Sequence, residues 1–158
     1  MTPPWLAAES IVHAQIIVAA HHRHTRRHLI PATADPVADA TALYDARVVV
    51  LAHDGGEDPR FVYANRTAQT LWGYTWAEFI GMPSRLSAPP DQRAVREGLL
   101  LAGRADGVVI ARDLVRVTRT GRRFIIDEIV LWNLDQDGMR GQAATYGRWR
   151  FVDGDGAA

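Results

Sequence analysis

The sequence contains neither cysteine nor lysine. The lack of cysteine excludes disulfide bonds, thiolate metal sites, cysteine nucleophiles and cysteinyl–flavin adducts. Because all 18 basic residues are arginine, a lysine Schiff base and the phosphate-binding lysine of a P-loop are excluded as well. Any chemistry of this chain must therefore come from other side chains.

The chain also lacks net charge and long apolar runs. Its 18 basic residues balance 18 acidic ones, so no overall field attracts it to nucleic acid or acidic lipid. No apolar run reaches the roughly 20 residues that span a bilayer, and the N-terminus has no basic segment typical of a secretory signal. We therefore expect a cytoplasmic protein with neither membranes nor nucleic acids as partners.

What is present suits one folded domain, because 47% of the 158 residues are hydrophobic. The periodicity of these residues predicts an α+β fold, in which a five-stranded antiparallel sheet is flanked by short helices and preceded by a helical extension. Helices are expected at Trp5–Ala20, Asp35–Ala46 and Thr67–Trp72, from Thr75 onward, and at Asp91–Ala102. Strands are expected at Arg47–Ala52, Phe61–Ala64, Val108–Thr118, Arg122–Leu134 and Met139–Val152.

These elements divide the chain into an extension (residues 1–46), a domain (residues 47–152) and a frayed tail (residues 153–158). Apolar spacing predicts which sides face the core. The last helix is expected to turn inward Val95, Leu99 and Ala102. The third strand is expected to share one side among Val109, Ala111, Val115 and Val117.

The first helix is apolar around most of its circumference. One predicted stripe comprises Trp5, Ala8, Val12, Ile16 and Ala19. Other apolar residues, including Ile17, lie off this stripe, so the helix needs more than one surface to bury. We therefore expect it to pack on its own domain and also on a second copy, forming a homodimer.

Three histidines follow the first helix at spacings that place them on one helical face. His21, His24 and His28 could in this geometry contact a metal ion. However, no carboxylate completes the ligand set, and the intervening arginines repel a cation. We interpret the segment as a solvated, basic helix end, which the helix dipole favours.

The stretch Phe61–Pro90 is the most informative part of the chain. A strand ends at Asn65, which can cap a short helix, and Thr75 with Glu78 forms the pattern of a capping box before a second one. This order of elements resembles the PAS fold. The phrases Leu71–Gly81 and Arg119–Phe124 are similar to those around the short helices and a hairpin of PAS domains.

The MEKHLA domain family, a PAS-like group, is a closer resemblance that covers nearly the full chain. It is carried by Pro3–Leu6, Leu51–Pro59, the segment from Trp76 to Ala88, Leu131–Leu134 and Gly141–Trp149. PAS domains hold small ligands between the sheet and the short helices. The resemblance therefore implies a sensory or small-molecule-binding module that acts through a partner or a homodimer.

Several polar and aromatic residues are candidates for binding such a ligand. They are Asn65, Trp72, Ser84, Arg85, Asn133, Gln142 and Tyr146. A helix cap, core packing and a turn are competing interpretations for Asn65, Trp72 and Asn133 respectively. Arg85 and Gln142 are favoured, the latter because an amide on an otherwise apolar strand needs a partner.

The resemblance also allows two known PAS cofactors to be tested. In the flavin photoreceptor branch, Ser84 stands where the photoactive cysteine would be, and the flavin-binding asparagines would fall near Arg116 and Ile126. A haem would need a histidine on the last helix or the strand after it, but none follows His53. We therefore expect neither flavin nor haem, and no cofactor is assigned.

A small enzyme that uses the same pocket is the alternative. Asp127 and Glu128 are adjacent in a strand, so the period of two turns one of them inward as a candidate acid or base. Pairing with Arg112 or Arg122 across the strands is the structural interpretation. The sequence contains no catalytic triad, metal set or phosphate loop, so no catalytic or metal-binding residue is assigned.

Overall fold

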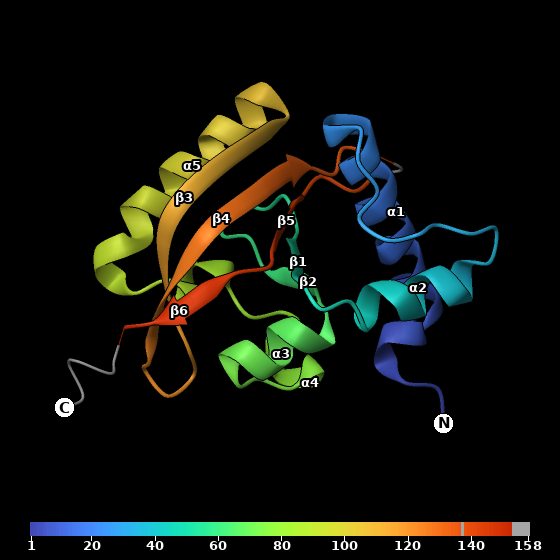
Figure 1. Ribbon diagram of the computed structural model, residues 1–158, viewed down its shortest axis with the longest axis horizontal. Coiled ribbons are helices and arrows are strands. Elements are labelled where there is room, and N and C mark those ends of the chain that lie inside the picture. The colour runs from blue at the N-terminus through green and yellow to red at the C-terminus, as the bar shows by residue number, and fades with distance from the viewer. Residues whose placement is uncertain (137, 153–158) are drawn as a thin grey trace.

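The computed structural model describes residues 1–136 and 138–152, in which six antiparallel strands form one sheet with helices on both faces (Figure 1). The helices and 3₁₀ turns are η1 (Pro4–Leu6), α1 (Ala8–Thr25), α2 (Pro36–Tyr44), α3 (Arg66–Trp72), α4 (Trp76–Phe79), η2 (Ser84–Ser87), η3 (Pro90–Gln92) and α5 (Arg93–Asp106). The strands are β1 (Val49–His53), β2 (Phe61–Ala64), β3 (Val108–Val117), β4 (Arg123–Asn133), β5 (Gln142–Tyr146) and β6 (Trp149–Phe151). The α+β class predicted from the sequence is confirmed.

The strand order is β2-β1-β5-β4-β3, and β6 pairs with β4. The single last strand expected at Met139–Val152 is wrong, because the chain is divided there into β5 and β6. At this interruption the Asp127 amide donates to the Arg148 carbonyl at 3.0 Å. The expected tail, residues 153–158, lies outside the described residues.

A local irregularity in β3 changes which residues face α5. Arg112 pairs with Glu128 and Leu114 with Ile126, while Asp113 between them has a φ of 58°. Aspartate is among the residues that adopt this left-handed conformation most readily. The alternation therefore shifts by one residue, and Leu114 is buried on the same side as the residues before the shift.

This shift overturns one expectation. Val109 and Ala111 do pack against the core on the α5 side of the sheet, but Leu114 and Arg116 follow them inward. Val115 and Val117 were predicted to share the side of Val109, and that prediction is wrong.

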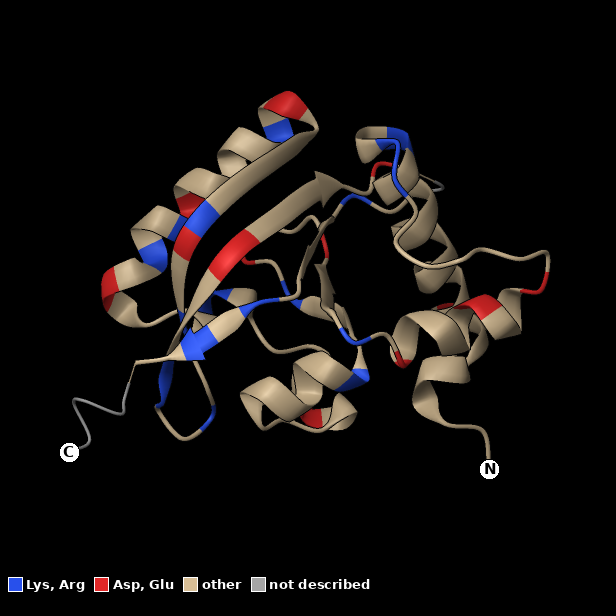
Figure 2. Ribbon diagram, viewed as in Figure 1, with Lys and Arg blue, Asp and Glu red and all other residues tan. Residues whose placement is uncertain are grey.

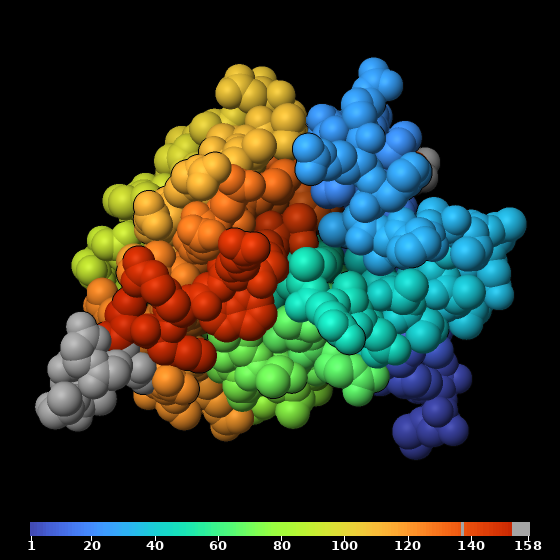
Figure 3. All heavy atoms as spheres, viewed as in Figure 1, coloured from blue at the N-terminus to red at the C-terminus, as the bar shows by residue number. Residues whose placement is uncertain are grey.

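Two cores lie on opposite faces of the sheet. The core on the side of α3, α4 and α5 includes Leu51, Trp72, Phe79, Phe124 and Ile129. The other core lies under α1 and α2 and includes Ile17, Leu43, Val50, Tyr63 and Trp132. In Figure 3 the N-terminal segments pack directly beside the strand segments coloured orange and red. The extension thus covers a face of the sheet that would otherwise expose its apolar side chains.

The helix α1 begins later and ends later than predicted, and its apolar stripe is also different. Its buried residues are Ser10, Ala14, Ile16, Ile17, Ala20 and His21. Val12, in the predicted stripe, has 48% of its surface exposed. The stripe was wrong because the positions of α2 and the sheet, rather than the hydrophobicity of a helix apolar on most sides, decide which side is buried. The homodimer through this helix stays a prediction.

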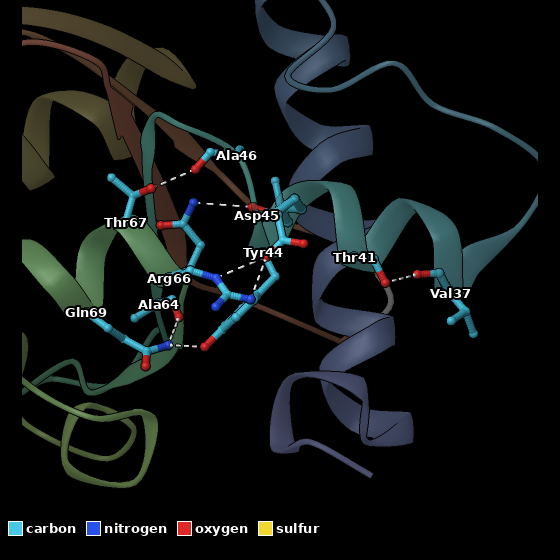
Figure 4. Close-up of polar contacts among 11 residues, drawn as sticks. Val37, Thr41, Tyr44, Asp45, Ala46, Ala64, Arg66, Thr67 and Gln69 are labelled. Atoms are coloured by element: carbon cyan, nitrogen blue, oxygen red, sulfur yellow. Dashed lines mark hydrogen bonds and ion pairs between the residues drawn. The ribbon is translucent and has the colours of Figure 1, made fainter.

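Polar contacts join the end of α2 to the start of α3 (Figure 4). Arg66 contacts Asp45 at 2.8 Å, and the Gln69 amide donates to the Tyr44 hydroxyl at 3.0 Å. The Thr67 hydroxyl donates to the Ala46 carbonyl at 2.7 Å. These contacts connect the extension to the short helices of the domain.

Candidate ligand-binding site

A cavity of about 50 Å³ lies between the sheet, η2 and α5. Its walls are mostly apolar and include Phe61, Trp72, Leu99, Ile126, Leu131 and Ala144. Apolar walls with a few convergent polar groups are typical of small-molecule sites. The polar groups are therefore the informative part of this cavity.

Arg116 lines the cavity from β3 and is only 7% exposed. Its Nη1 donates to the carbonyl of the adjacent Val115 at 2.9 Å. The pKa of Arg116 is lowered to about 10, mainly by burial and also by the nearby Arg96, while Tyr146 opposes the shift. At neutral pH the guanidinium is therefore still charged.

Arg96 reaches the same cavity from α5 and is 5% exposed. Its Nη2 donates to the Ser84 hydroxyl on η2. Burial also lowers the pKa of Arg96, and this is the largest influence on it. Two guanidinium groups thus meet in one apolar cavity.

No carboxylate in the described residues forms an ion pair with either arginine. The ion pairs in the described part of the chain lie instead on the surface. Examples are the pairs between Arg112 and Glu128 and between Arg123 and Asp91. Figure 2 shows acidic and basic residues interspersed along α5 and the adjacent strands. Exposed pairs of this kind contribute little stability, whereas an unpaired buried charge is costly.

His53, at the end of β1, adds an acceptor to the cavity wall. Its Nδ1 lies 2.8 Å from the Asp54 carbonyl, which can only accept a hydrogen bond, so Nδ1 carries the proton. Burial lowers the pKa of His53 to about 4. The imidazole is therefore neutral at pH 7, and its buried Nε2 is an acceptor without a partner among the described residues.

Tyr146, on β5, contributes a hydroxyl that also has no hydrogen-bond partner among residues 1–136 and 138–152. Burial raises the pKa of Tyr146 well above its ordinary value, although the charge of Arg116 opposes this shift. The hydroxyl therefore stays protonated and can donate a hydrogen bond to a ligand. Buried polar groups normally have partners, so these unpaired atoms indicate a site.

The amino-acid sequence was compared with models of known protein families. The model of the MEKHLA domain matches residues 11–151. The chain belongs to the MEKHLA domain family. The match begins inside α1, so the family model includes most of the helical extension.

Solved structures place the MEKHLA domain among PAS folds. A PAS domain from Colwellia psychrerythraea is 16% identical with a TM-score of 0.61, over 75% of this chain and 98% of that one. A fungal LOV domain photoreceptor is 20% identical with a TM-score of 0.58, over 94% and 98%. An RNA-binding light-oxygen-voltage receptor is 26% identical with a TM-score of 0.57, over 75% of this chain and 33% of that one. No curated protein matches the sequence significantly.

The MEKHLA domain brings three of the predicted ligand-binding residues together at the cavity. These are Trp72, Ser84 and Tyr146. Arg96 and Arg116 line the same cavity but were missed as ligand-binding candidates. The signal for Arg116 is an arginine within the β-rich run of β3, which indicates an inward side chain only if the shift at Asp113 is recognised.

Three of the predicted ligand-binding residues do not line the cavity, namely Asn65, Asn133 and Gln142. Their side-chain amides instead form hydrogen bonds between different elements of the domain. Gln142 Nε2 donates to the Leu100 carbonyl of α5 at 2.9 Å and to Asn133 Oδ1 at 3.2 Å. Asn133 Nδ2 in turn lies 3.4 Å from the Arg104 carbonyl. This pair therefore connects α5 to β4 and β5.

Arg85 also lies away from the cavity, although the sequence favoured it. It is exposed on η2 and its Nε contacts Asp58 Oδ1 at 3.1 Å. We expect Arg85→Ala to change the free energy of unfolding by less than about 0.5 kcal/mol, because exposed pairs are worth little. Urea unfolding measures this, and Arg60→Ala, at another exposed arginine, is the control. A loss above about 2 kcal/mol would show a structural role for Arg85.

The acidic pair of the enzyme alternative is not in the cavity of the MEKHLA domain. Asp127 and Glu128 are both exposed, and Glu128 contacts Arg112 at 2.5 Å. The structural pairing interpreted from the sequence is thus present for Glu128. Neither residue lines the cavity described above.

His21 and His24 lie in the last turns of α1, but the helix ends at Thr25, with Arg26 in the left-handed conformation at a φ of 62°, so His28 does not continue their helical face. His21 is buried edge-on against Trp132, while the His28 ring stacks on His22. In the described part of the chain, no three histidine or acidic side chains are placed to hold a metal ion. In the same part, no helix is long and apolar enough to cross a bilayer.

Proposed function

We propose that this MEKHLA domain is a sensory module that binds a small molecule between α5 and the sheet, and that it acts through a partner or a second copy of the chain. The observation that carries the proposal is that His53 and Tyr146 line the cavity and that each holds a buried polar atom without a hydrogen-bond partner in the described part of the chain. The PAS fold of the solved relatives supports it, because the cavity occupies the ligand position expected from the resemblance.

A ligand in this cavity would contact elements from several parts of the chain. His53 belongs to β1, Ser84 to η2, Arg96 to α5 and Arg116 to β3. Because α5 packs across the sheet, ligand contacts on both would change how tightly they associate. Such a change in the packing of α5 could alter the surface that a partner contacts, so ligand binding would affect partner binding.

The cavity favours a ligand smaller than a flavin. The Ser84 hydroxyl accepts from Arg96, and Arg116 and Ile126 occupy the walls where flavin-binding asparagines were considered. A volume of about 50 Å³ limits the ligand further. We therefore propose a compact organic molecule in place of a ring cofactor.

Filling the cavity is expected to abolish binding. Ala144 lines the cavity from β5, so Ala144→Leu places a larger side chain in the space, while Ala144→Ser keeps nearly the same volume. Thermal unfolding is measured with a panel of small neutral, anionic and cationic compounds. We expect at least one compound to raise the Tm of the wild type and of Ala144→Ser by more than about 2 °C, with no shift in Ala144→Leu.

Native mass spectrometry of the protein purified from its own host complements this panel. A retained small mass that is lost in Ala144→Leu supports the proposal. If a compound raises the Tm of the wild type and of Ala144→Leu equally, it binds outside the cavity. No shift with any compound, together with no retained mass, would leave a domain that works by protein contacts alone.

A further inference from the structure

We infer that the ligand is a small organic acid whose carboxylate binds between Arg96 and Arg116. This inference rests on the proposed function, since it concerns the same cavity. Both arginines are buried and line the cavity, and in the described part of the chain neither forms an ion pair with a carboxylate. Glu97 and Asp58 act on Arg96 only at longer range. An anion in the cavity would supply the missing charge.

The energetic argument is the cost of the two positive charges. Removing a cation from water without a partner costs several kcal/mol even after the protein relaxes. Within the described residues, Arg116 donates one hydrogen bond, to its neighbouring carbonyl, and Arg96 donates one, to a neutral hydroxyl. Planar guanidinium donors match a carboxylate, which can accept from two of them at once. A bound carboxylate therefore offsets a cost that the protein alone leaves uncompensated.

The placement of neighbouring apolar residues points the same way. On α5, Val95 is 53% exposed while the adjacent Arg96 is buried. On β3, the shift at Asp113 turns Arg116 inward and Val115 outward. In both elements a charged residue takes the inward position and a valine is turned away from it. Such violations of the hydrophobic pattern concentrate at functional sites.

The other groups of the cavity define the rest of the ligand. Most of the wall is apolar, so the body of the acid is a short aliphatic or small aromatic group. The Tyr146 hydroxyl can donate a further hydrogen bond to the carboxylate, since Tyr146 and Arg116 line the same cavity and this hydroxyl has no partner in the described part of the chain. The unpartnered Nε2 of His53 can accept from a hydroxyl or N–H on the ligand.

The experiment compares acids with neutral molecules of the same shape. The probes are butanoate with butanamide, benzoate with benzamide, and 3-hydroxybutanoate, each titrated by calorimetry into the wild-type protein. We expect the carboxylates to bind at least about tenfold more tightly than their amides, because each amide lacks the charge that the guanidinium groups attract. We expect 3-hydroxybutanoate to bind more tightly than butanoate, because its hydroxyl can donate to His53.

Substitution of the arginines gives the second half of the test. Arg116→Met and, independently, Arg96→Met are expected to lower the affinity for the best carboxylate at least about tenfold. Arg112→Met, on the same strand but exposed, is the matched control and is expected to leave the affinity unchanged. Without ligand, Arg116→Met is expected to have a Tm equal to or above that of the wild type, because an uncompensated buried charge is removed.

The outcomes separate this inference from the proposed function. Tight carboxylates, weak amides and loss of affinity in both arginine variants support the inference. Binding of neutral panel compounds in the cavity without any binding of the carboxylates overturns it and leaves the proposed function intact. A Tm of unliganded Arg116→Met far below that of the wild type also overturns it, since Arg116 would then be a structural residue.

Discussion

Replacing Asn65 by alanine is expected to lower the free energy of unfolding by about 4 kcal/mol. The side chain is completely buried and makes four hydrogen bonds to the backbone. Its Oδ1 accepts from the Val50 and Ala68 amides at 3.0 and 3.1 Å. Its Nδ2 donates to the Leu43 and Val48 carbonyls at 3.2 and 2.9 Å.

The size of the effect follows from what the substitution leaves behind. Alanine would remove the side-chain partner of the Val50 and Ala68 amides and of the Val48 carbonyl, while the Leu43 carbonyl would keep the Ala46 amide as a donor. Each buried group left unpaired costs about 1–3 kcal/mol before relaxation. These groups belong to the end of α2, the start of β1 and the first turn of α3, so three elements lose a shared anchor. Relaxation and water entry keep the total below the sum of the separate costs.

Urea unfolding followed by circular dichroism measures the loss, and the control is Thr67→Ala, which removes one side-chain hydrogen bond, to the Ala46 carbonyl. The control is expected to lose about 1 kcal/mol. If Asn65→Ala unfolds like the wild type but no longer binds the carboxylate probes, its role is in ligand binding, as the sequence also allowed. Our expectation is the reverse, because every polar atom of the side chain already has a protein partner.

The sequence predicted correctly those features that a few adjacent residues decide. The cap of α3 by Asn65 is confirmed, and so is the capping box in which Thr75 and Glu78 bond each other's backbone amides. A left-handed Gly73, with a φ of 82°, ends α3 as its position indicated. Such signals are local, so they survive in the tertiary structure.

The orientation of longer elements could not be predicted in the same way. The side of α1 that is buried depends on α2 and on the sheet, and most sides of this helix are apolar. The inward side of β3 depends on a single shifted residue, Asp113, which an alternating pattern cannot reveal. Arg116 was missed for this reason, whereas Arg96 was missed because α5 was expected to turn Val95 inward, and Val95 is 53% exposed. Of the residues proposed from the sequence as ligand contacts, Trp72, Ser84 and Tyr146 do line the cavity.

Lowering the pH from 7 to 4 is expected to remove about 3 kcal/mol of stability through His53 alone. Burial lowers its pKa in the folded protein from 6.5 to about 4. The charges of Arg96 and Arg104 contribute to this lowering of the pKa, while the charge and the carbonyl of Asp54 oppose it. In the unfolded chain His53 therefore binds a proton as the pH falls below about 6.5, whereas in the folded protein it binds one only near pH 4.

The sign of the effect follows from this difference in bound protons. Between pH 6.5 and 4 the unfolded state holds more protons than the folded state, so stability falls as the pH falls. Burial also lowers the pKa values of His13, His21 and His24, so each contributes a loss of the same sign. The contribution of His53 is obtained by comparison with His53→Gln, which cannot titrate but keeps a donor for the Asp54 carbonyl.

Urea unfolding at several pH values between 4 and 7 measures both proteins, and the wild type is expected to lose about 3 kcal/mol more than His53→Gln across this range. Parallel curves would contradict a buried, neutral His53. A steeper dependence of the wild-type free energy of unfolding on pH would show that His53 is neutral in the cavity wall at pH 7. A protonated His53 would add a third positive charge near Arg96 and remove the acceptor at Nε2, so the neutral form is the one suited to bind a ligand that carries both a carboxylate and a hydrogen-bond donor.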